Sequence, residues 1–463
     1  MLLEALGMQI TCWHHQTSNL KGQAAANLSE YLNFRLKIVD LNFAALDRSY
    51  GELIKRHEAL RATFFKLDNT IWQSINKYRK RLYELEVFDL VDTFEQDELI
   101  IEKTAGAIRV ITRLHKGPLI KGLLFKIRHD QHLLICVLND IIADAESTRI
   151  LKENISSLYR HYKHGQEIPD VPDRSAEKIL MKQYRHTKGQ YADKDKEYWL
   201  IKLRNHVAPI DFNPFLKIYS SECRKNEKLD KGLKGLSIDL FLSNRLFNGS
   251  QVYFTDLSSK TLFRLRAISQ ACRVSIFSLH ITAFNFLLFF FNKKNRNLIA
   301  TTVNDRKLPA ERNIVGHLMY KVYLSELIDG NMAACDIIRK VYLHFIQACK
   351  HPIYNESEYD HLYPDHYTDL YLNYLKMSDI RTVEVVKNIH ARASNSYYAL
   401  SCHIEEYDNT VGLYWHYNLD IFTPGSIEFM ADMYKHIIGA LEDLNIPILE
   451  LQRKYTRLAD TNI

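Results

Sequence analysis

Hydrophobic and polar positions in the N-terminal third follow first a helical and then a strand pattern. Large and apolar side chains recur at helical spacing over Leu46–Leu60, which predicts an amphipathic helix. Two segments rich in β-forming residues follow, Arg61–Leu67 and Thr70–Ile75, and the turn residues Asp68 and Asn69 separate them. This order predicts a β-hairpin directly after the helix.

A second hairpin is predicted where Leu123–Ile127 and Leu133–Leu138 flank a polar turn. The second of these strands is apolar on both faces, which is typical of a strand in the middle of a buried sheet. The strand ends before the polar pair Asn139 and Asp140. We expect a helix to follow with Asp144 as its N-cap, because a short acidic side chain can accept the free N–H groups of a first turn.

The apolar periodicity is lost from His161 to about Lys178, where glycine and prolines interrupt the chain. We predict a boundary here between an N-terminal lobe of residues 1–165 and a C-terminal lobe of residues 178–463. The later patterns predict helices over Ser258–Cys272, Ser275–Asn292 and Ser426–Leu444, and strands over Leu298–Val303, Asp369–Leu375, Tyr397–His403 and Val411–Tyr417. Mixed helices and strands in two halves indicate an α/β (α+β) fold with two lobes.

The stretch from Val274 to Phe291 carries no formal charge and approaches the length of a membrane-spanning helix. It also contains polar side chains, among them His280 and Asn285, which a lipid-facing helix would have to hide. We therefore interpret it as a helix buried in a protein core.

Composition narrows the class of protein without naming a function. The chain has 463 residues, of which 46% are hydrophobic and 25% charged, as in ordinary globular proteins. A formal charge of +6 over this length is too weak to indicate a nucleic-acid partner, although it permits a local basic surface. The 7 cysteines include no C-x-x-C pair, and the N-terminus has no basic region or cleavage pattern typical of a signal peptide. We expect free thiols, a cytoplasmic protein and no membrane association.

Candidate chemistry concentrates where the buried strand meets the next helix. Asn139, Asp140, Asp144 and Ser147 fall within this junction, and strand-to-helix junctions commonly carry ligands or catalytic groups. The alternative is that Asp144 only caps the helix and Asp140 is a solvated loop acid. No metal site is predicted: the pair His14-His15 points to different faces of a helix or strand.

Two further observations exclude common sites. The segment Gly232–Ser237 lacks the acidic residue that precedes a pantetheine-attachment serine, so we assign no attachment site there. The sequence contains no P-loop, no G-x-G-x-x-G, no G-x-S-x-G and no H-E-x-x-H pattern.

Several blocks resemble, in the same order, the signatures of condensation domains from nonribosomal peptide synthetases. The segment from Arg56 to Phe64 (RHEALRATF) carries the closest resemblance. The other matching blocks are Gln9 with Trp13, Ile135 to Tyr159, Glu197 to Trp199, Ile299 to Arg306, Val315 to Tyr320, and Asn418 to Phe422. Together they extend over nearly the whole chain.

This resemblance implies a fold, a partner and a reaction. The family has two lobes similar to chloramphenicol acetyltransferase, set in a V around a central tunnel. Acyl or peptidyl carrier proteins insert phosphopantetheine arms from opposite ends, and a donor thioester is joined to an acceptor amine or alcohol. The resemblance therefore implies substrates carried on phosphopantetheine, no bound cofactor, and other synthetase modules as further partners. Because the length leaves no room for adenylation or carrier domains, we expect a free-standing member.

The departures from the family pattern fall in its H-H-x-x-x-D-G motif. The two histidine positions are Asn139 and Asp140, and the glycine position is Ala145. The family's structural aspartate is retained as Asp144, and the resemblance implies that it pairs with Arg306. In V-G-x-F-x-N, the asparagine position is Tyr320.

Heterocyclization domains, a branch of the family, carry D-x-x-x-x-D-x-x-S instead. Here Asp144 and Ser147 match that pattern, but the first aspartate is Asn139, which cannot act as a carboxylate base. Asp140 lies one residue later, and a shift by one residue reverses the facing on a strand.

Three functions follow from these residues. The first is condensation-type acyl transfer in which Asp140 and Asn139 occupy the catalytic positions, while Asp144, Arg306 and Ser147 support the site. The second is a catalytically inactive module that binds carriers or partner enzymes. The third is heterocyclization-like or dehydration chemistry.

Overall fold

The computed structural model describes residues 1–17, 31–168, 177–204, 250–292, 296–355, 370–376, 398–419, 421–441 and 444–453. In the N-terminal half the strands are β1 (Leu2–Glu4), β2 (Tyr31–Val39), β3 (Ala62–Leu67), β4 (Thr70–Ile75), β5 (Glu86–Asp89), β6 (Ile120–Lys126) and β7 (Gln131–Asn139). The helices of this half are α1 (Met8–Thr17), α2 (Phe43–Arg56), α3 (Gln96–Ile111) and α4 (Ala145–Lys163), with short 3-10 turns η2 (Glu58–Arg61), η3 (Lys80–Leu82) and η4 (Asp140–Ile142).

The second half begins with α5 (Glu177–Thr187) and α6 (Ala192–Arg204). Its strands are β8 (Ser250–Leu257), β9 (Arg296–Asn304), β10 (Met319–Leu327), β11 (Leu370–Lys376), β12 (Leu400–Glu406) and β13 (Val411–Asn418). Its other helices are α10 (Ser259–Cys272), α11 (Ile276–Asn292), α12 (Ala334–Ala348) and α13 (Pro424–Ala440), with the 3-10 turn η5 (Pro309–Glu311).

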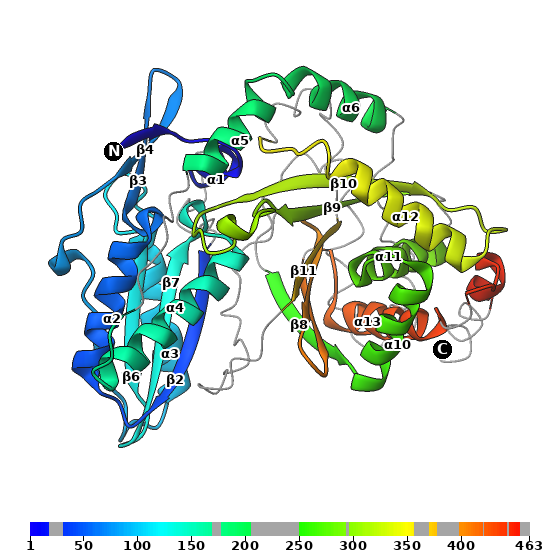
Figure 1. Cartoon of the computed structure of the whole chain (residues 1–463). Helices are drawn as coiled ribbons and strands as arrows, with labels where there is room; N and C mark the ends of the chain where they lie inside the picture. The colour runs from blue at the N-terminus through cyan, green and yellow to red at the C-terminus, as the bar shows by residue number, and fades with distance from the viewer. Residues whose placement is uncertain are drawn as a thin grey trace, which may run out of the picture.

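Strand β7 lies inside the sheet β2-β7-β6-β5, so the predicted hairpin and its central strand are confirmed. Its two apolar faces enter separate cores. Leu134, Cys136 and Leu138 pack with residues of α2 and α4, whereas Ile135 and Val137 pack with residues of α3. The strand, labelled in Figure 1, is therefore buried on both sides. Asn139 at its carboxyl end and Asp140 directly after it are also buried.

The first hairpin is also confirmed, because β3 and β4 pair antiparallel and β1 extends them into a second sheet. The helix before this hairpin begins and ends earlier than the predicted range Leu46–Leu60. It covers Phe43–Arg56, with Asn42 as N-cap, and the last predicted turn forms the separate 3-10 turn Glu58–Arg61. His57 separates the two because its backbone is extended (φ −109°, ψ 105°).

In the second half the described strands form one sheet in the order β10-β9-β11-β12-β13-β8. The helices α10 to α13 cover the face turned away from the N-terminal half (Figure 1). The last helix ends at Ala440, earlier than predicted, and β12 begins at Leu400, later than predicted. The segment of the predicted boundary at 169–176 lies outside the described residues, so the division into 1–165 and 178–463 stays a prediction.

Helix α11 is the charge-free stretch of the sequence, and it is buried as predicted. Ile281, Phe284 and Leu288 have no exposed surface and belong to the core between the sheet and α13. Among the residues described here, no single helix is long and apolar enough to span a membrane. Among these described residues, one pair of helices, Ser259–Cys272 and Ile276–Phe290, has the required length and apolar composition when the two helices are taken together. The chain bends by 102° between them.

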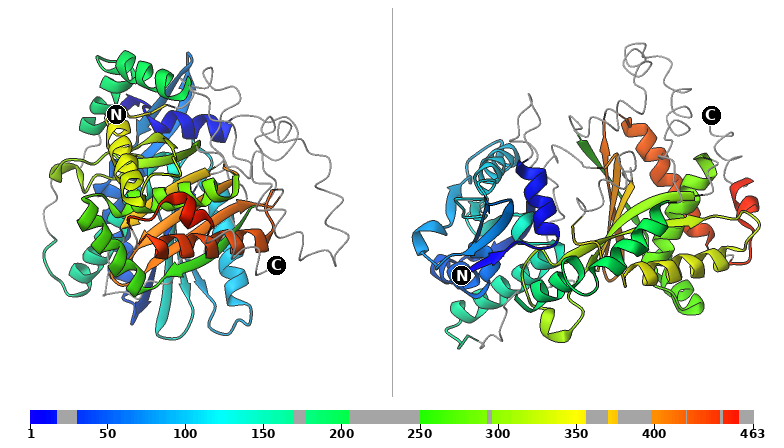
Figure 2. Two further views of the ribbon diagram at one scale, coloured as in Figure 1. Left: turned by 90° about the vertical axis from the view of Figure 1, so that its right-hand side faces the viewer. Right: turned by 90° about the horizontal axis from the view of Figure 1, so that it is seen from above.

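The two halves meet along one edge. The loop between β9 and β10 reaches the start of α4, and α5 lies beside it, between the halves (Figures 1 and 2). Lys182 of α5 bonds Asp305 through an ion pair of 2.9 Å. This ion pair holds α5 and the β9–β10 loop together beside the position where the candidate site lies.

Candidate functional site

The candidate site is built at the junction of β7, η4 and α4. Asn139 ends the strand, Asp140 opens the 3-10 turn and Asp144 precedes the helix. All three are buried, with exposed fractions of 0%, 6% and 2%. Buried polar groups need partners, so the contacts of each one indicate its role.

Asp144 caps α4 as predicted and also binds across the two halves. Its Oδ1 accepts from the backbone N–H of Ser147 at 2.8 Å. Arg306 donates to both carboxylate oxygens, from Nη1 to Oδ2 at 2.7 Å and from Nη2 to Oδ1 at 3.0 Å. The backbone N–H of Leu318 donates to Oδ2 at 3.0 Å. The ion pair that the family resemblance implied is therefore present, in the bidentate form that favours arginine.

Every guanidinium nitrogen of Arg306 has a partner. Besides Asp144, Nε donates to the carbonyl of Ile314 at 2.7 Å, Nη1 to Oδ1 of Asn304 at 3.1 Å, and Nη2 to the carbonyl of Gly316 at 3.0 Å. Burial alone would raise the pKa of Asp144. The charge and hydrogen bonds of Arg306, with the hydrogen bond from Ser147, hold that pKa below its ordinary value. Asp144 is therefore a carboxylate whose lone pairs are committed to the fold.

Ser147 extends this contact to the β9–β10 loop. Its hydroxyl lies 2.7 Å from Oδ1 of Asp144 and 2.9 Å from the carbonyl of Gly316. It also accepts from the backbone N–H of Gly316 at 3.1 Å and from Arg306 at 3.0 Å. These contacts give Ser147 a structural position, with its oxygen enclosed between the halves.

Asn139 forms a reciprocal amide pair with Gln16 of α1. Gln16 Nε2 donates to Oδ1 of Asn139 at 3.1 Å, and Nδ2 of Asn139 donates to Oε1 of Gln16 at 2.9 Å. The same side chain accepts from the backbone N–H of Ile141 and donates to the carbonyl of Ile111. An amide has two donors and two lone pairs on oxygen, so these contacts fill the capacity of Asn139. In this conformation it has no hydrogen bond left for a substrate.

Asp140 lies between α1 and the β9–β10 loop. Its Oδ1 accepts from Nε2 of Gln16 at 2.9 Å, and its Oδ2 accepts from Sγ of Cys12 at 3.6 Å. The backbone carbonyl of Asp140 lies 2.5 Å from Nδ1 of His317. Asp140 is thus no solvated loop acid but a buried carboxylate held between the two halves.

Sequence reasoning missed three residues of this site: Cys12, Gln16 and His317. Each of them lies more than a hundred residues from Asp140 in the sequence. None of them is one of the residues that define the matching family signatures. The only sequence signal was that Cys12 and Gln16 accompany Trp13 on one short segment, and that His317 follows Gly316 in a matching block.

The remaining sequence candidates do not join the site. His14 is exposed on α1, and Gly232–Ser237 lies outside the described residues. Tyr320, at the asparagine position of its block, is buried and donates to the carbonyl of Cys349 at 3.3 Å.

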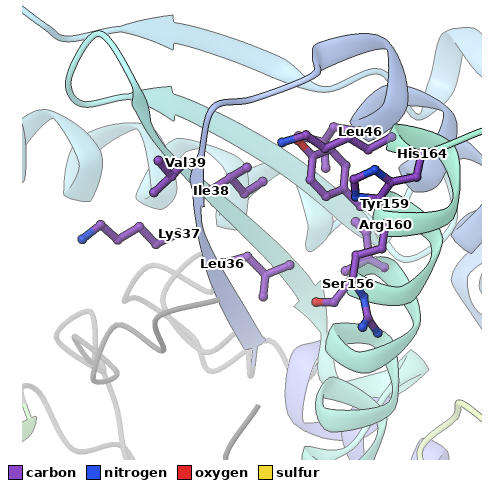
Figure 3. A pocket seen from close by; sticks show the side chains of 11 residues that line it. Leu36, Lys37, Ile38, Val39, Leu46, Ser156, Tyr159, Arg160 and His164 are labelled. Atoms are coloured by element: carbon purple, nitrogen blue, oxygen red, sulfur yellow. The ribbon is translucent and has the colours of Figure 1, made fainter. Parts of the chain in front are cut away.

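A pocket of about 330 Å³ lies elsewhere on the N-terminal half, between β2 and α4 (Figure 3). Apolar side chains such as Leu36 and Ile38 line it together with the basic residues Lys37, Arg160 and Lys163. None of the candidate site residues contributes to it.

Comparison with known proteins decides the family. The signature described as "Condensation domain" matches residues 5–452. The chain belongs to the condensation-domain family. Bacitracin synthase 3 of Bacillus licheniformis is 28% identical over 167 residues, which are 36% of this chain and 3% of that protein. The condensation-domain chain therefore spans a small part of the curated relatives it matches.

Solved structures support the fold of this condensation-domain protein. The first condensation domain of the calcium-dependent antibiotic synthetase superposes with a TM-score of 0.75 at 13% identity, covering 97% of this chain and 99% of that one. The epimerization domain from the third module of tyrocidine synthetase B gives 0.74 at 16% identity, covering 95% and 98%. The two-lobed fold similar to chloramphenicol acetyltransferase is thus confirmed. Since domains with different names share it, the reaction must be argued from the site.

Proposed function

We propose that this condensation-domain protein acts in nonribosomal peptide synthesis as an acyltransferase, with Asp140 in place of the usual histidine. It would transfer an acyl group from a carrier-protein thioester to an amine or hydroxyl acceptor. The observation that carries the proposal is the buried Asp140 carboxylate at the histidine position, held by Gln16 while the neighbouring Asp144–Arg306 pair is intact.

A carboxylate at this position changes what the site does best. An aspartate has an ordinary pKa near 3.9, against about 6.5 for histidine, so it is a weaker base at neutral pH. Its negative charge can instead hold a protonated amine acceptor beside the thioester. Positioning two tethered substrates contributes more to rate than general base catalysis, which gives about 10²–10⁴-fold. Loss of the histidine is therefore compatible with turnover.

The proposed partners are acyl or peptidyl carrier proteins whose phosphopantetheine arms bring the substrates. Support comes from the family match and from the similarity to bacitracin synthase 3 and surfactin synthase subunit 2. No disulfide joins the described cysteines, which suits a reducing compartment such as the cytoplasm. They are Cys12, Cys136, Cys272, Cys335, Cys349 and Cys402.

A second candidate function, a binding module without catalysis, has one observation in its favour. Both carboxylate oxygens of Asp140 contact protein side chains, one Gln16 and the other Cys12. A substrate must displace or join these contacts, whereas a module that only binds a carrier needs no access to them. Heterocyclization-like chemistry has less support, because Asn139 stands at its first aspartate position with its amide fully bonded.

The test is acyl transfer between loaded carriers encoded beside this chain's gene, with product measured by mass spectrometry. Asp140→Ala should reduce turnover by about 10²-fold or more, as expected for loss of a proton-transferring or substrate-holding group. Asp140→Asn keeps the shape but removes the charge, so retained activity would show that Asp140 orients a substrate by hydrogen bonding. The control Asp130→Ala changes an exposed aspartate in the β6–β7 turn and should leave turnover unchanged.

The outcomes separate the two functions. Product from the parent protein that is lost in Asp140→Ala supports catalysis at this position. No product from any carrier pair, together with measurable carrier binding, supports the binding module. A higher turnover in Asp140→His than in the parent would show that the other residues needed for condensation are retained.

A further inference from the structure

Three metal-ligating side chains meet at the candidate site from three separate segments. Cys12 comes from α1, Asp140 from η4 and His317 from the β9–β10 loop. Their exposed fractions are 2%, 6% and 7%, and one ligand atom from each lies within 4.8 Å of the other two. We propose that Cys12, Asp140 and His317 bind one zinc-class divalent cation between the two halves of the molecule.

Two of the three ligand-to-ligand distances fit a tetrahedral site. Sγ of Cys12 lies 3.6 Å from Oδ2 of Asp140 and 3.8 Å from Nδ1 of His317. With zinc bonds of about 2.3 Å to sulfur and about 2.0–2.1 Å to nitrogen or oxygen, tetrahedral ligand atoms lie roughly 3.5 Å apart. These two separations differ from this value by a few tenths of an ångström, which small side-chain rotations can close.

The donor types select the class of metal. A thiolate and an imidazole favour zinc and similar transition metals, whereas magnesium and calcium prefer oxygen donors throughout. The carbonyl oxygen of Asp140, 2.5 Å from Nδ1 of His317, lies beside the same cluster. That distance is too short for both atoms to bind one tetrahedral zinc ion, so a water or substrate oxygen completes the four ligands, since three protein ligands leave one position open.

Charge and protons balance in this site. Binding a divalent cation releases the Cys12 thiol proton to solvent, and the neutral imidazole of His317 moves its remaining proton from Nδ1 to Nε2. A thiolate and the Asp140 carboxylate then neutralise the two positive charges, so the buried cluster carries no net charge. Nε2 of His317 is buried without a hydrogen-bond partner among the described residues.

This site does not depend on the acyl-transfer proposal, because metal binding is measured without substrates. It would nevertheless alter the chemistry of the same place. A cation with an open position would polarise a carbonyl oxygen as a Lewis acid. This cation would lie at the position where this chain has Asp140 instead of the family's histidine.

The experiment uses the full chain, stripped with a chelator and dialysed against Zn²⁺ or Co²⁺ alone. We expect one equivalent per chain by elemental analysis and, for Co²⁺, a thiolate-to-cobalt charge-transfer band. Cys12→Ala and His317→Ala should each weaken binding by about 100-fold or more, since loss of even an outer-shell partner costs about 10–100-fold. Cys349→Ala and His132→Ala, which change residues outside the cluster, should keep the stoichiometry and affinity of the parent.

Two results would overturn the proposal. One is the absence of a thiolate-to-cobalt band in the unaltered protein at saturating Co²⁺, a measurement that requires no variant to fold. The other is binding that remains at parent affinity in Cys12→Ser and His317→Asn, whose smaller changes favour correct folding. Circular dichroism identifies any variant that has lost its structure, and the cobalt spectrum of the parent then decides.

Discussion

Asp144 and Arg306 are 162 residues apart in sequence, yet the guanidinium donates to both oxygens of the carboxylate at 2.7 and 3.0 Å. Asp144 belongs to the start of α4, and Arg306 follows β9 in the other half of the molecule. Both side chains are 1% exposed. This pair therefore joins the two halves at the candidate site, and its loss should lower the free energy of unfolding of the whole protein.

Asp144→Ala should destabilise the protein by about 3–5 kcal/mol, because it leaves the buried Arg306 without its counter-charge. We expect a large fall in melting temperature by differential scanning calorimetry. Asp89→Ala is the control, since it removes an exposed ion pair with Lys126 and should leave the melting temperature unchanged. An unchanged melting temperature of Asp144→Ala would contradict the structural role of Asp144 and make it a catalytic candidate.

Gln16→Ala should destabilise the fold and loosen the candidate site. The substitution removes the amide that pairs with Asn139 and donates to Asp140, so buried polar atoms of both residues each lose a hydrogen bond. Such a loss costs about 1–3 kcal/mol, measurable by urea unfolding. Thr17→Ala, at an exposed position of the same helix, is the matched control. Equal stability of both variants would show that the Gln16 pair contributes little.

His280 should make stability depend on pH. Burial lowers its pKa from 6.5 to about 4. Below pH 6.5 His280 therefore becomes protonated in the unfolded chain, whereas in the folded protein it stays neutral until the pH approaches 4. The free energy of unfolding should fall across this window by roughly 3 kcal/mol, because each pH unit between the two pKa values contributes about 1.4 kcal/mol.

The measurement is urea unfolding from pH 7 to pH 4, compared between the parent and His280→Gln. The variant lacks the titrating group, so its stability should decline less steeply over the same window, even if it is lower throughout. Because Tyr434 contacts Nδ1 of His280, Tyr434→Phe serves as a control that keeps the histidine. Parallel pH profiles for the parent and His280→Gln would contradict the prediction.

Binding of an acidic holo-carrier protein should weaken as salt rises. The net charge of +6 favours attraction to an acidic partner, and screening shortens that attraction to about 8 Å at physiological ionic strength. Fluorescence anisotropy of a labelled holo-carrier from the same gene cluster, at low and high salt, measures the effect. The apo-carrier is the control for the contribution of the phosphopantetheine arm. No binding of any cluster carrier at any salt would contradict both proposed functions.

The sequence by itself determined the local elements that repeat a clear period. The two apolar faces of β7 predicted a central strand, and β7 is buried between two cores. Asp144 was recognised as an N-cap because the chemistry of helix caps is local. The charge-free stretch was recognised as the buried helix α11 from its own polar residues. Element ends were less accurate, since the extended backbone at His57 has no counterpart in the apolar pattern.

Only the tertiary structure decided what surrounds Asp140. Gln16, Cys12 and His317 reach it from α1 and from the β9–β10 loop, and no periodicity links those positions. Family resemblance aligned Asn139 and Asp140 with the two histidines of the motif, and their contacts differ because successive residues leave the end of β7 in different directions. Asn139 is fully bonded within the fold, whereas Asp140 lies beside a thiol and an imidazole. That difference depends on which distant segments pack against the strand end, and packing between segments is set by the folded chain as a whole.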